Sequence, residues 1–200
     1  MTTKKTSVLL AALTLCLTLA SCGNASSQTS TQASTASSAQ SSSQTQESAQ
    51  SEAPTKKTVA KDGANMQTQD ASMPTRVPME GGTKINMHFG DTVIPGVLND
   101  SETAKALIAK LPITQHVNRY SHDFCGVTEE LPYKQDEVHY GWLNGDIDYA
   151  TDAPYFTILF EDQDVSEQYG SQVNIGVITC PLKDIANLEG SFDVRIELAE

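Results

Sequence analysis

From residue 83 onward the chain alternates short apolar and polar runs, a pattern typical of half-buried β-strands. The first two runs, 84–89 and 92–98, flank Gly90-Asp91, so we expect the folded region to open with a β-hairpin. Further runs that predict strands lie at 113–120, 138–143, 146–149, 155–161, 173–179 and 192–198. Asn144-Gly145 is the strongest hairpin signal in the sequence, and it predicts that 138–143 pairs with 146–149.

One segment has helical spacing instead. Apolar residues recur three or four positions apart at Ala104, Leu107, Ile108 and Leu111, and Pro112 follows them. Asn99 precedes this run and Glu102 stands three positions later, so we expect Asn99 to cap the helix in a reciprocal capping arrangement. The run 181–188 predicts a short second helix, because its leucine and isoleucine residues share one face.

About seven or eight short strands with one helix after the first hairpin predict a mainly β domain. We expect a small closed or nearly closed β-barrel with the helix at one end, because closure removes the exposed edges of a sheet. An open β-sandwich is the alternative arrangement.

Residues 1–21 have the pattern of a bacterial lipoprotein signal peptide. Lys4 and Lys5 precede a short apolar run at 8–19, which is too short to span a bilayer comfortably. Leu19-Ala20-Ser21-Cys22 then resembles the lipobox, in which the cysteine thiol accepts a diacylglyceryl group. We therefore expect a lipoprotein of the cell envelope, held outside the cytoplasm on a membrane by the lipid on Cys22.

After Cys22 the composition changes to Ser, Gln, Thr and Ala, and residues 23–82 contain no Trp, Tyr, Phe, Leu or Ile. Such a segment cannot bury enough apolar surface to offset the entropy lost on ordering. Residues 22–82 are therefore predicted to form a disordered tether with a root-mean-square reach of roughly 40 Å, and 83–200 a single domain.

That domain is strongly acidic. The chain has a formal net charge of −12, and residues 83–200 hold seven Lys and Arg against twenty Asp and Glu. This balance disfavours nucleic acid as a partner. We expect a monomer.

Three segments resemble the bacterial cyclophilin-like fold proteins: Asn99 to Leu107 with Leu111-Pro112, then Gly145 to Tyr149, then Asn174 to Ile178. The resemblance implies a β-barrel related to cyclophilin, in a family often found as lipoproteins or fused to flavodoxin-like domains and largely without assigned activity. This sequence contains no flavodoxin-like segment, so we infer no flavin and no other cofactor.

The same resemblance makes prolyl isomerase activity a candidate function. True cyclophilins carry an Arg, a Phe five residues later and a Gln eight residues after the Arg. Arg119 and Phe124 reproduce the first spacing, but Val127 stands at the Gln position. In an isomerase, the Arg would stabilise the amide as its resonance is lost, and the Phe would line the proline pocket. Alternatively, Arg119 pairs with a carboxylate and Phe124 belongs to the core.

Trp142, beside the Asn144-Gly145 turn, is the third candidate for a ligand pocket. An aromatic residue there either packs in the core or lines a barrel mouth.

Cys125 and Cys180 are candidates for one disulfide, which an oxidising compartment would favour, and buried free thiols are the alternative. His116, His122 and His139 fall near Cys125, but their spacing matches no closed metal-binding pattern, so we expect no metal site.

The sequence contains no nucleophile elbow, phosphate-binding loop or His-Glu-x-x-His helix. We therefore expect a binding or interaction module without catalytic activity, with a small molecule or peptide in a pocket at the barrel mouth. The alternative is a divergent peptidyl-prolyl isomerase that acts on exported proteins.

Overall fold

The computed structural model describes residues 56–63, 65–66 and 69–200. The predicted signal peptide, Cys22 and most of the predicted tether lie outside these residues. None of the helices within them is long and apolar enough to cross a membrane.

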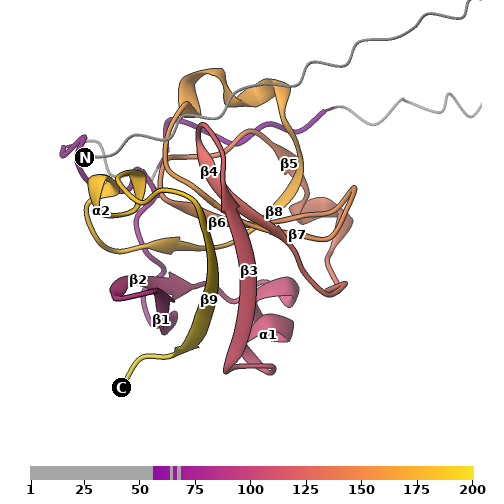
Figure 1. Cartoon of the computed structure of the whole chain (residues 1–200). Helices are drawn as coiled ribbons and strands as arrows, with labels where there is room; N and C mark the ends of the chain where they lie inside the picture. The colour runs from indigo at the N-terminus through magenta and orange to yellow at the C-terminus, as the bar shows by residue number, and fades with distance from the viewer. Residues whose placement is uncertain (1–55, 64, 67–68) are drawn as a thin grey trace, which may run out of the picture. The chain divides into compact units, whose positions relative to one another are not determined.

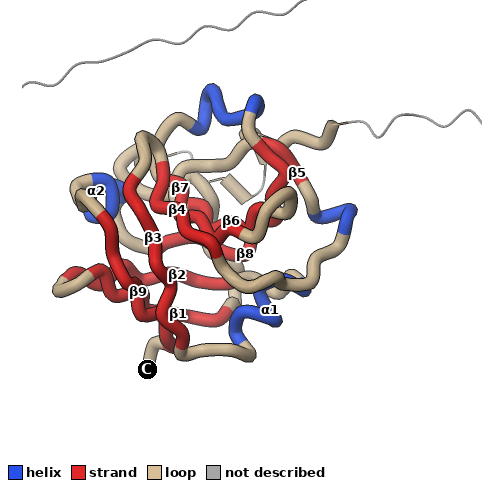
Figure 2. The backbone as a smooth tube through the Cα atoms, turned by 45° about the vertical axis from the view of Figure 1, so that its right-hand side comes forward, coloured by secondary structure: helices blue, strands red, loops and turns tan. Residues whose placement is uncertain are grey.

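Nine strands form one antiparallel sheet, and short helices lie at its periphery (Figures 1 and 2). The strands are β1 (Thr83–Phe89), β2 (Thr92–Leu98), β3 (Ile113–Arg119), β4 (Asp123–Val127), β5 (His139–Tyr140), β6 (Asp146–Ala150), β7 (Tyr155–Leu159), β8 (Gly170–Ile178) and β9 (Ser191–Leu198). The helices are α1 (Glu102–Ile108) and α2 (Leu182–Ala186), with 3-10 turns η1 (Gln135–Glu137) and η2 (Gln163–Gln168).

The sheet closes into an eight-stranded barrel. Its order is β2-β1-β9-β3-β4-β7-β6-β8, and β2 also pairs with β8, which completes the ring. β5 is an extra strand on the free part of β8. The predicted barrel and its opening hairpin are thus confirmed, because the alternating apolar side chains of β1 and β2 fill the interior.

Helix α1 lies where the spacing predicted it, but its cap is Ser101 and not Asn99. The Ser101 Oγ accepts a hydrogen bond from the Ala104 N–H at 3.1 Å. Asn99 instead accepts from the Ser101 N–H and donates to Asn174 on β8. The expected capping box between Asn99 and Glu102 was wrong because the Asn99 side chain serves a contact between α1 and the sheet. Helix α2 lies within the predicted run 181–188.

The predicted hairpin at Asn144-Gly145 was also wrong. Only His139–Tyr140 of the run 138–143 is a strand, and it pairs with β8, whereas β6 pairs with β7 and β8. The Leu143 N–H donates to the Asp146 carboxylate at 2.9 Å, which turns the chain sharply into β6. A strand that the sequence missed, β4, contains Phe124 and Cys125 and pairs with β3 and β7.

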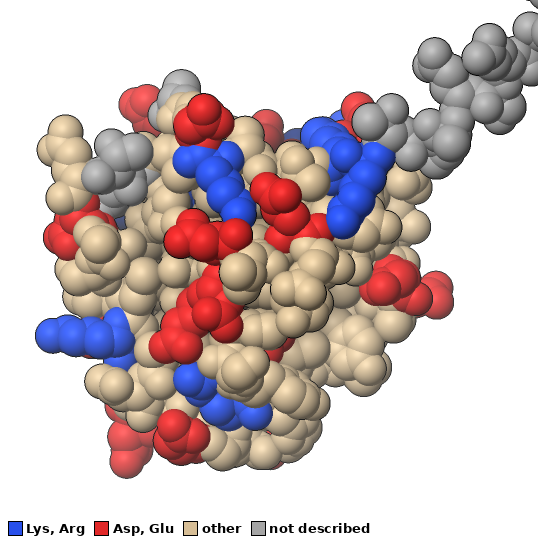
Figure 3. All heavy atoms as spheres, turned by 90° about the horizontal axis from the view of Figure 1, so that it is seen from above, with Lys and Arg blue, Asp and Glu red and all other residues tan. Residues whose placement is uncertain are grey.

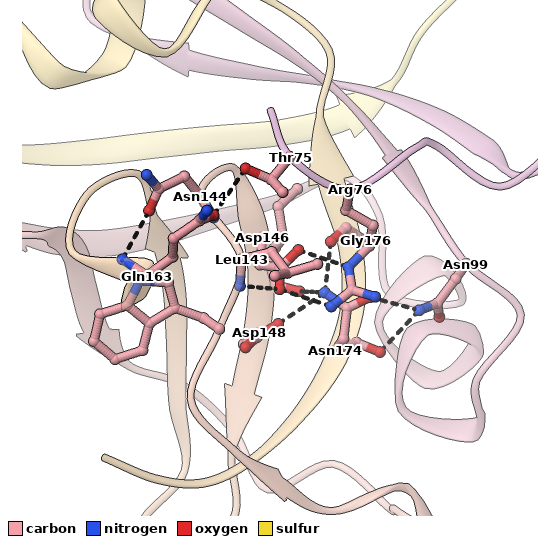
Figure 4. A network of polar contacts seen from close by, with 12 residues as sticks. Thr75, Arg76, Asn99, Leu143, Asn144, Asp146, Asp148, Gln163, Asn174 and Gly176 are labelled. Atoms are coloured by element: carbon pink, nitrogen blue, oxygen red, sulfur yellow. Dashed lines mark hydrogen bonds and ion pairs between the residues drawn. The ribbon is translucent and has the colours of Figure 1, made fainter. Parts of the chain in front are cut away.

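The ordered domain begins before residue 83. Residues 69–82, which we call the N-terminal segment, run across the barrel next to the β6 strand end (Figures 1 and 4). The Thr75 N–H donates to the Asn144 carbonyl at 2.8 Å, the Leu182 N–H donates to the Ser72 carbonyl at 2.8 Å, and Pro74 is buried. Composition placed this segment in the tether, because backbone hydrogen bonds and the burial of a single proline are not revealed by a low apolar content.

Candidate functional site

Arg76 of the N-terminal segment forms a two-point ion pair with Asp146 at the start of β6. Arg76 Nε lies 2.7 Å from Asp146 Oδ1, and Nη2 lies 2.8 Å from Oδ2 (Figure 4). Asp146 is completely buried. Burial by itself would lower the pKa of Arg76, but its hydrogen bonds and charge attraction to Asp146 outweigh this and raise it.

Asp148 lies two residues further along β6 and is also completely buried. Burial, and then the negative charge of Asp146, raise the pKa of Asp148 well above its ordinary value. Its Oδ1 accepts a hydrogen bond from Asn174 Nδ2 at 2.9 Å, while Oδ2 has no partner among the described residues. The two aspartates therefore differ in role: Asp146 forms the ion pair with Arg76, and Asp148 is a carboxyl group with a raised pKa.

The alternation of β6 places both carboxyl groups on the same side of the strand. Ile147 and Tyr149 belong to the barrel core, so Asp146 and Asp148 point to its outer face, where Arg76 of the N-terminal segment pairs with Asp146. Alternation alone would let both aspartates face solvent from that side of the strand. In the structure both are completely buried, because Arg76 pairs with Asp146 and Asn174 binds Asp148.

Two asparagines complete this group, which we call the polar centre (Arg76, Asn99, Asp146, Asp148 and Asn174). Asn99 Nδ2 donates to the Asn174 carbonyl at 2.8 Å and to its Oδ1 at 3.2 Å. Asn174 Nδ2 in turn donates to the Gly176 carbonyl at 2.8 Å as well as to Asp148. The three segments that carried the family resemblance thus meet at one place in the fold.

A cavity of about 410 Å³ opens beside the polar centre. The N-terminal segment forms one wall with Arg76 and Met79, and the barrel forms the other with Val97, Asn99 and Asn174. Arg76 Nη1 has no hydrogen-bond partner among the described residues, so the guanidinium can donate to an oxygen atom in this cavity. The combination of apolar walls and a few convergent polar groups is typical of small-molecule sites.

The isomerase candidates Arg119 and Phe124 lie next to each other, with the Arg119 guanidinium 5.8 Å from the Phe124 ring centroid. Phe124 is completely buried and packs edge-on against Phe89 and Phe192 in the core. The Arg119 guanidinium lies 4.3 Å from the Phe160 ring centroid and donates to the carbonyls of Ser121 and Ala186. Main-chain carbonyls thus hold the guanidinium, and the Phe124 side chain belongs to the core.

Trp142 is buried and does not line the cavity at the polar centre. Its Nε1 donates to the Glu161 carbonyl at 2.8 Å, and its ring packs at a tilt against His122 and Tyr169, with ring centroids 4.8 and 5.5 Å away. Of the two alternatives, a core residue or a residue of the barrel mouth, Trp142 is a core residue.

Cys125 and Cys180 do not form the candidate disulfide. Both are free thiols, as in the alternative given above. Cys125 lies on β4 and Cys180 follows β8, and strands β7 and β6 lie between β4 and β8 in the sheet. Burial raises the pKa of Cys125 to about 12 and that of Cys180 to about 11.

The three histidines near Cys125 in the sequence are dispersed in the fold. His116 pairs with Asp193 on the surface at 2.8 Å, His122 stacks on Trp142, and His139 is buried on β5. Within the described part of the chain, no three His, Cys, Asp or Glu side chains gather in a way that could hold a metal ion. Burial lowers the pKa of His139, whose Nδ1 bonds to the Gly141 carbonyl.

Comparison with protein families gives one match, to the cyclophilin-like family over residues 87–197. The chain belongs to the cyclophilin-like family. The match spans most of the barrel and three of the four segments of the polar centre, and Arg76 of the N-terminal segment lies outside it.

Among solved structures, this cyclophilin-like protein is similar to the solution structure of a hypothetical protein from Archaeoglobus fulgidus. The two share 18% sequence identity with a TM-score of 0.48, over 59% of this chain and 95% of the other. A search of the curated proteins found no match.

Sequence reasoning missed Arg76 and both aspartates as site residues. The local signal at Asp146 and Asp148 was present: two acidic residues alternate with apolar Ile147 and Tyr149 directly after a turn. No local signal marks Arg76, since it stands in a polar segment like many others in this chain.

Proposed function

We propose that this chain is a lipid-anchored extracytoplasmic protein whose cyclophilin-like domain binds a small polar molecule without transforming it. The lipobox at Leu19 to Cys22 and the polar composition that follows it support the anchor and the tether. The acidity of the domain fits a protein that stays clear of anionic surfaces.

The observation that carries the binding role is the cavity at the polar centre. Its volume of about 410 Å³ falls within the range of small-molecule sites, about 300–1,000 Å³. Arg76 is fixed in direction by Asp146 and has one guanidinium nitrogen left to donate. A ligand with a carbonyl or carboxylate oxygen would satisfy that donor while its apolar part lies against Val97 and Met79.

Prolyl isomerase activity receives no support from the placement of its candidate residues. Phe124 is inside the core, and Val127, at the position of the cyclophilin Gln, is 66% exposed on the barrel surface.

The test is a ligand screen by thermal shift on the chain from residue 22 carrying Cys22→Ser, with amino acids, dipeptides, sugar acids and nucleosides as probes. The Val97→Trp variant should fill the cavity and abolish saturable binding. Val93→Trp is the matched control, because Val93 lies on the same strand, is 45% exposed and does not line the cavity. Binding that survives Val97→Trp, or turnover of a bound probe, would overturn the proposal.

The anchor has its own test, metabolic labelling with radioactive palmitate in a bacterial host. Label should enter the native chain and be absent from the Cys22→Ala variant. Equal labelling of both chains would contradict lipid attachment at this residue.

A further inference from the structure

Strand β3 is paired along one side but almost unpaired along the other. β9 pairs with β3 over Ile113–Asn118, whereas β4 pairs with it only at Asn118 and Arg119. Successive residues of an antiparallel strand direct their main-chain groups to opposite sides. The Arg119 N–H donates to Gly190 on the β9 side and the Tyr120 N–H to Asp123 on the β4 side, so the even-numbered Thr114 faces away from β9.

Gln115 ends the pairing between β3 and β4. Hydrogen-bonded pairs in an antiparallel ladder are two residues apart. After Asn118 and Cys125, the next such pair would therefore be His116 and Val127. Instead, the buried Gln115 amide donates to the His116 carbonyl at 3.0 Å and to the Val127 carbonyl at 2.7 Å. Beyond this point, the N–H and C=O of Thr114 have no strand partner on the β4 side among the described residues.

The open edge borders a groove of about 670 Å³ between α1, β3 and the segment after β4. Leu107 and Leu131, which are 2% and 6% exposed, lie at its base. Val127 forms one wall and is 66% exposed, the largest exposed fraction among the large hydrophobic side chains that the structure describes. The groove thus combines unpaired main-chain groups with an apolar floor.

The basic side chains at this groove already face carboxylates. Lys110 pairs with Glu129, and His116 lies 2.8 Å from Asp193. The surrounding domain carries almost three acidic residues for each basic one. Charge complementarity therefore favours a basic occupant over an acidic one.

We propose that the groove is a second binding site, for an extended and positively charged peptide segment of another protein. The segment adds a strand to β3 by pairing with Thr114 and places an apolar side chain between Leu107, Val127 and Leu131. Such strand addition takes its affinity from main-chain hydrogen bonds and its selectivity from alternate side chains. The site is separate from the cavity at the polar centre and does not depend on the function proposed for it.

The test uses fluorescently labelled peptides of sequence Lys-Thr-X-Thr-Lys, with X as Val, Leu or Phe, and anisotropy with the chain from residue 22 carrying Cys22→Ser. At least one peptide should bind saturably. Its N-methylated form, in which the main chain can no longer donate, should lose binding. The version with Glu in place of both Lys should bind more weakly.

Matched protein variants locate the site. Val127→Asn should weaken binding about fivefold through lost apolar contact, and Val165→Asn, at a position of similar exposure on η2, should leave it unchanged. Val97→Trp should also leave peptide binding intact, which separates this site from the cavity. No saturation with any peptide, equal binding of the N-methylated form, equal affinity of the Glu version, or equal effects of the two Asn variants would overturn the proposal.

Discussion

Arg76 and Asp146 stand 70 positions apart in the sequence, yet the guanidinium binds both oxygens of the buried carboxylate at 2.7 and 2.8 Å. This ion pair joins the N-terminal segment to the barrel and orients the donor that we assign to ligand binding. It also places a charge at a position where water cannot solvate it.

Breaking the pair from one side should therefore be costly. Arg76→Met leaves the Asp146 carboxylate buried without its counter-ion, and we expect a loss of about 3–5 kcal/mol in the free energy of unfolding, measured by urea denaturation. The double variant Arg76→Met/Asp146→Leu should recover much of that loss, because no buried charge remains. Lys134→Met, which removes a partner of an exposed ion pair, is the control and should have little effect. A loss no larger than that of the control would show that the pair does not hold the segment.

Asp148 should make stability fall as pH rises. In the unfolded chain this carboxyl group ionises near its ordinary pKa of 3.8, whereas in the folded chain burial and Asp146 raise the pKa. Between these two values the folded state binds more protons, so the contribution is fully present below about pH 4 and is lost as pH increases toward the folded pKa.

Asp148→Asn keeps an acceptor for Asn174 and removes the titration. Urea denaturation from pH 4 to pH 8 should give the variant a flatter profile and a higher stability than the native chain at neutral pH. Asp123, whose pKa burial also raises, is present in both chains and will leave a residual slope. Parallel profiles of the two chains would contradict a protonated Asp148.

The two thiols should be inert in the folded state. With pKa values of about 12 and about 11, against an ordinary 9.0, Cys125 and Cys180 have roughly thousandfold and hundredfold less thiolate than a free cysteine. Labelling with Ellman's reagent at pH 8, in the chain carrying Cys22→Ser, should be slow and become fast in urea. Rapid labelling without denaturant would place a thiol in a more exposed setting than the structure has.

Gly145 is predicted to be essential for seating the N-terminal segment. Its φ of +100° disfavours other residues, and an added Cβ would lie 2.4 Å from the Pro74 Cβ. Gly190→Ala is the matched control, because its φ is +91° and no atom lies within 4 Å of the added Cβ. Both substitutions should cost about 1–3 kcal/mol of backbone strain, and Gly145→Ala alone should speed tryptic cleavage after Arg76. Equal cleavage of the two variants would show that Pro74 moves without releasing the segment.

Much of the fold follows from local periodicity. The alternation in β1 and β2, the helical spacing in α1 and the family motifs together predicted a β-barrel with a helix after its first hairpin. They did so because alternation shows which side of each strand is apolar, and this property depends only on residues that are close in the sequence.

Local pattern could not decide which strands are partners. His139–Tyr140 pairs with β8 and not with β6, although Asn144-Gly145 lies between His139–Tyr140 and β6 as a typical hairpin turn. The Asp146 side chain accepts a hydrogen bond from the Leu143 N–H there and redirects the chain, and His139–Tyr140 pairs with the part of β8 that β2 leaves open. Pairing energy depends on residues far apart in sequence, which a turn signal does not contain.

The sequence by itself determined the lipobox pattern, the acidity, the barrel class and the side of β6 on which Asp146 and Asp148 stand. Only the tertiary structure decided that this side is covered, that Arg76 is the counter-ion and that β3 and β4 separate at Gln115. The physical reason is that hydrophobic periodicity specifies the inner face of a barrel. The outer face is polar by the same pattern whether water or another segment of chain covers it, so the site built there became visible only when the chain was folded.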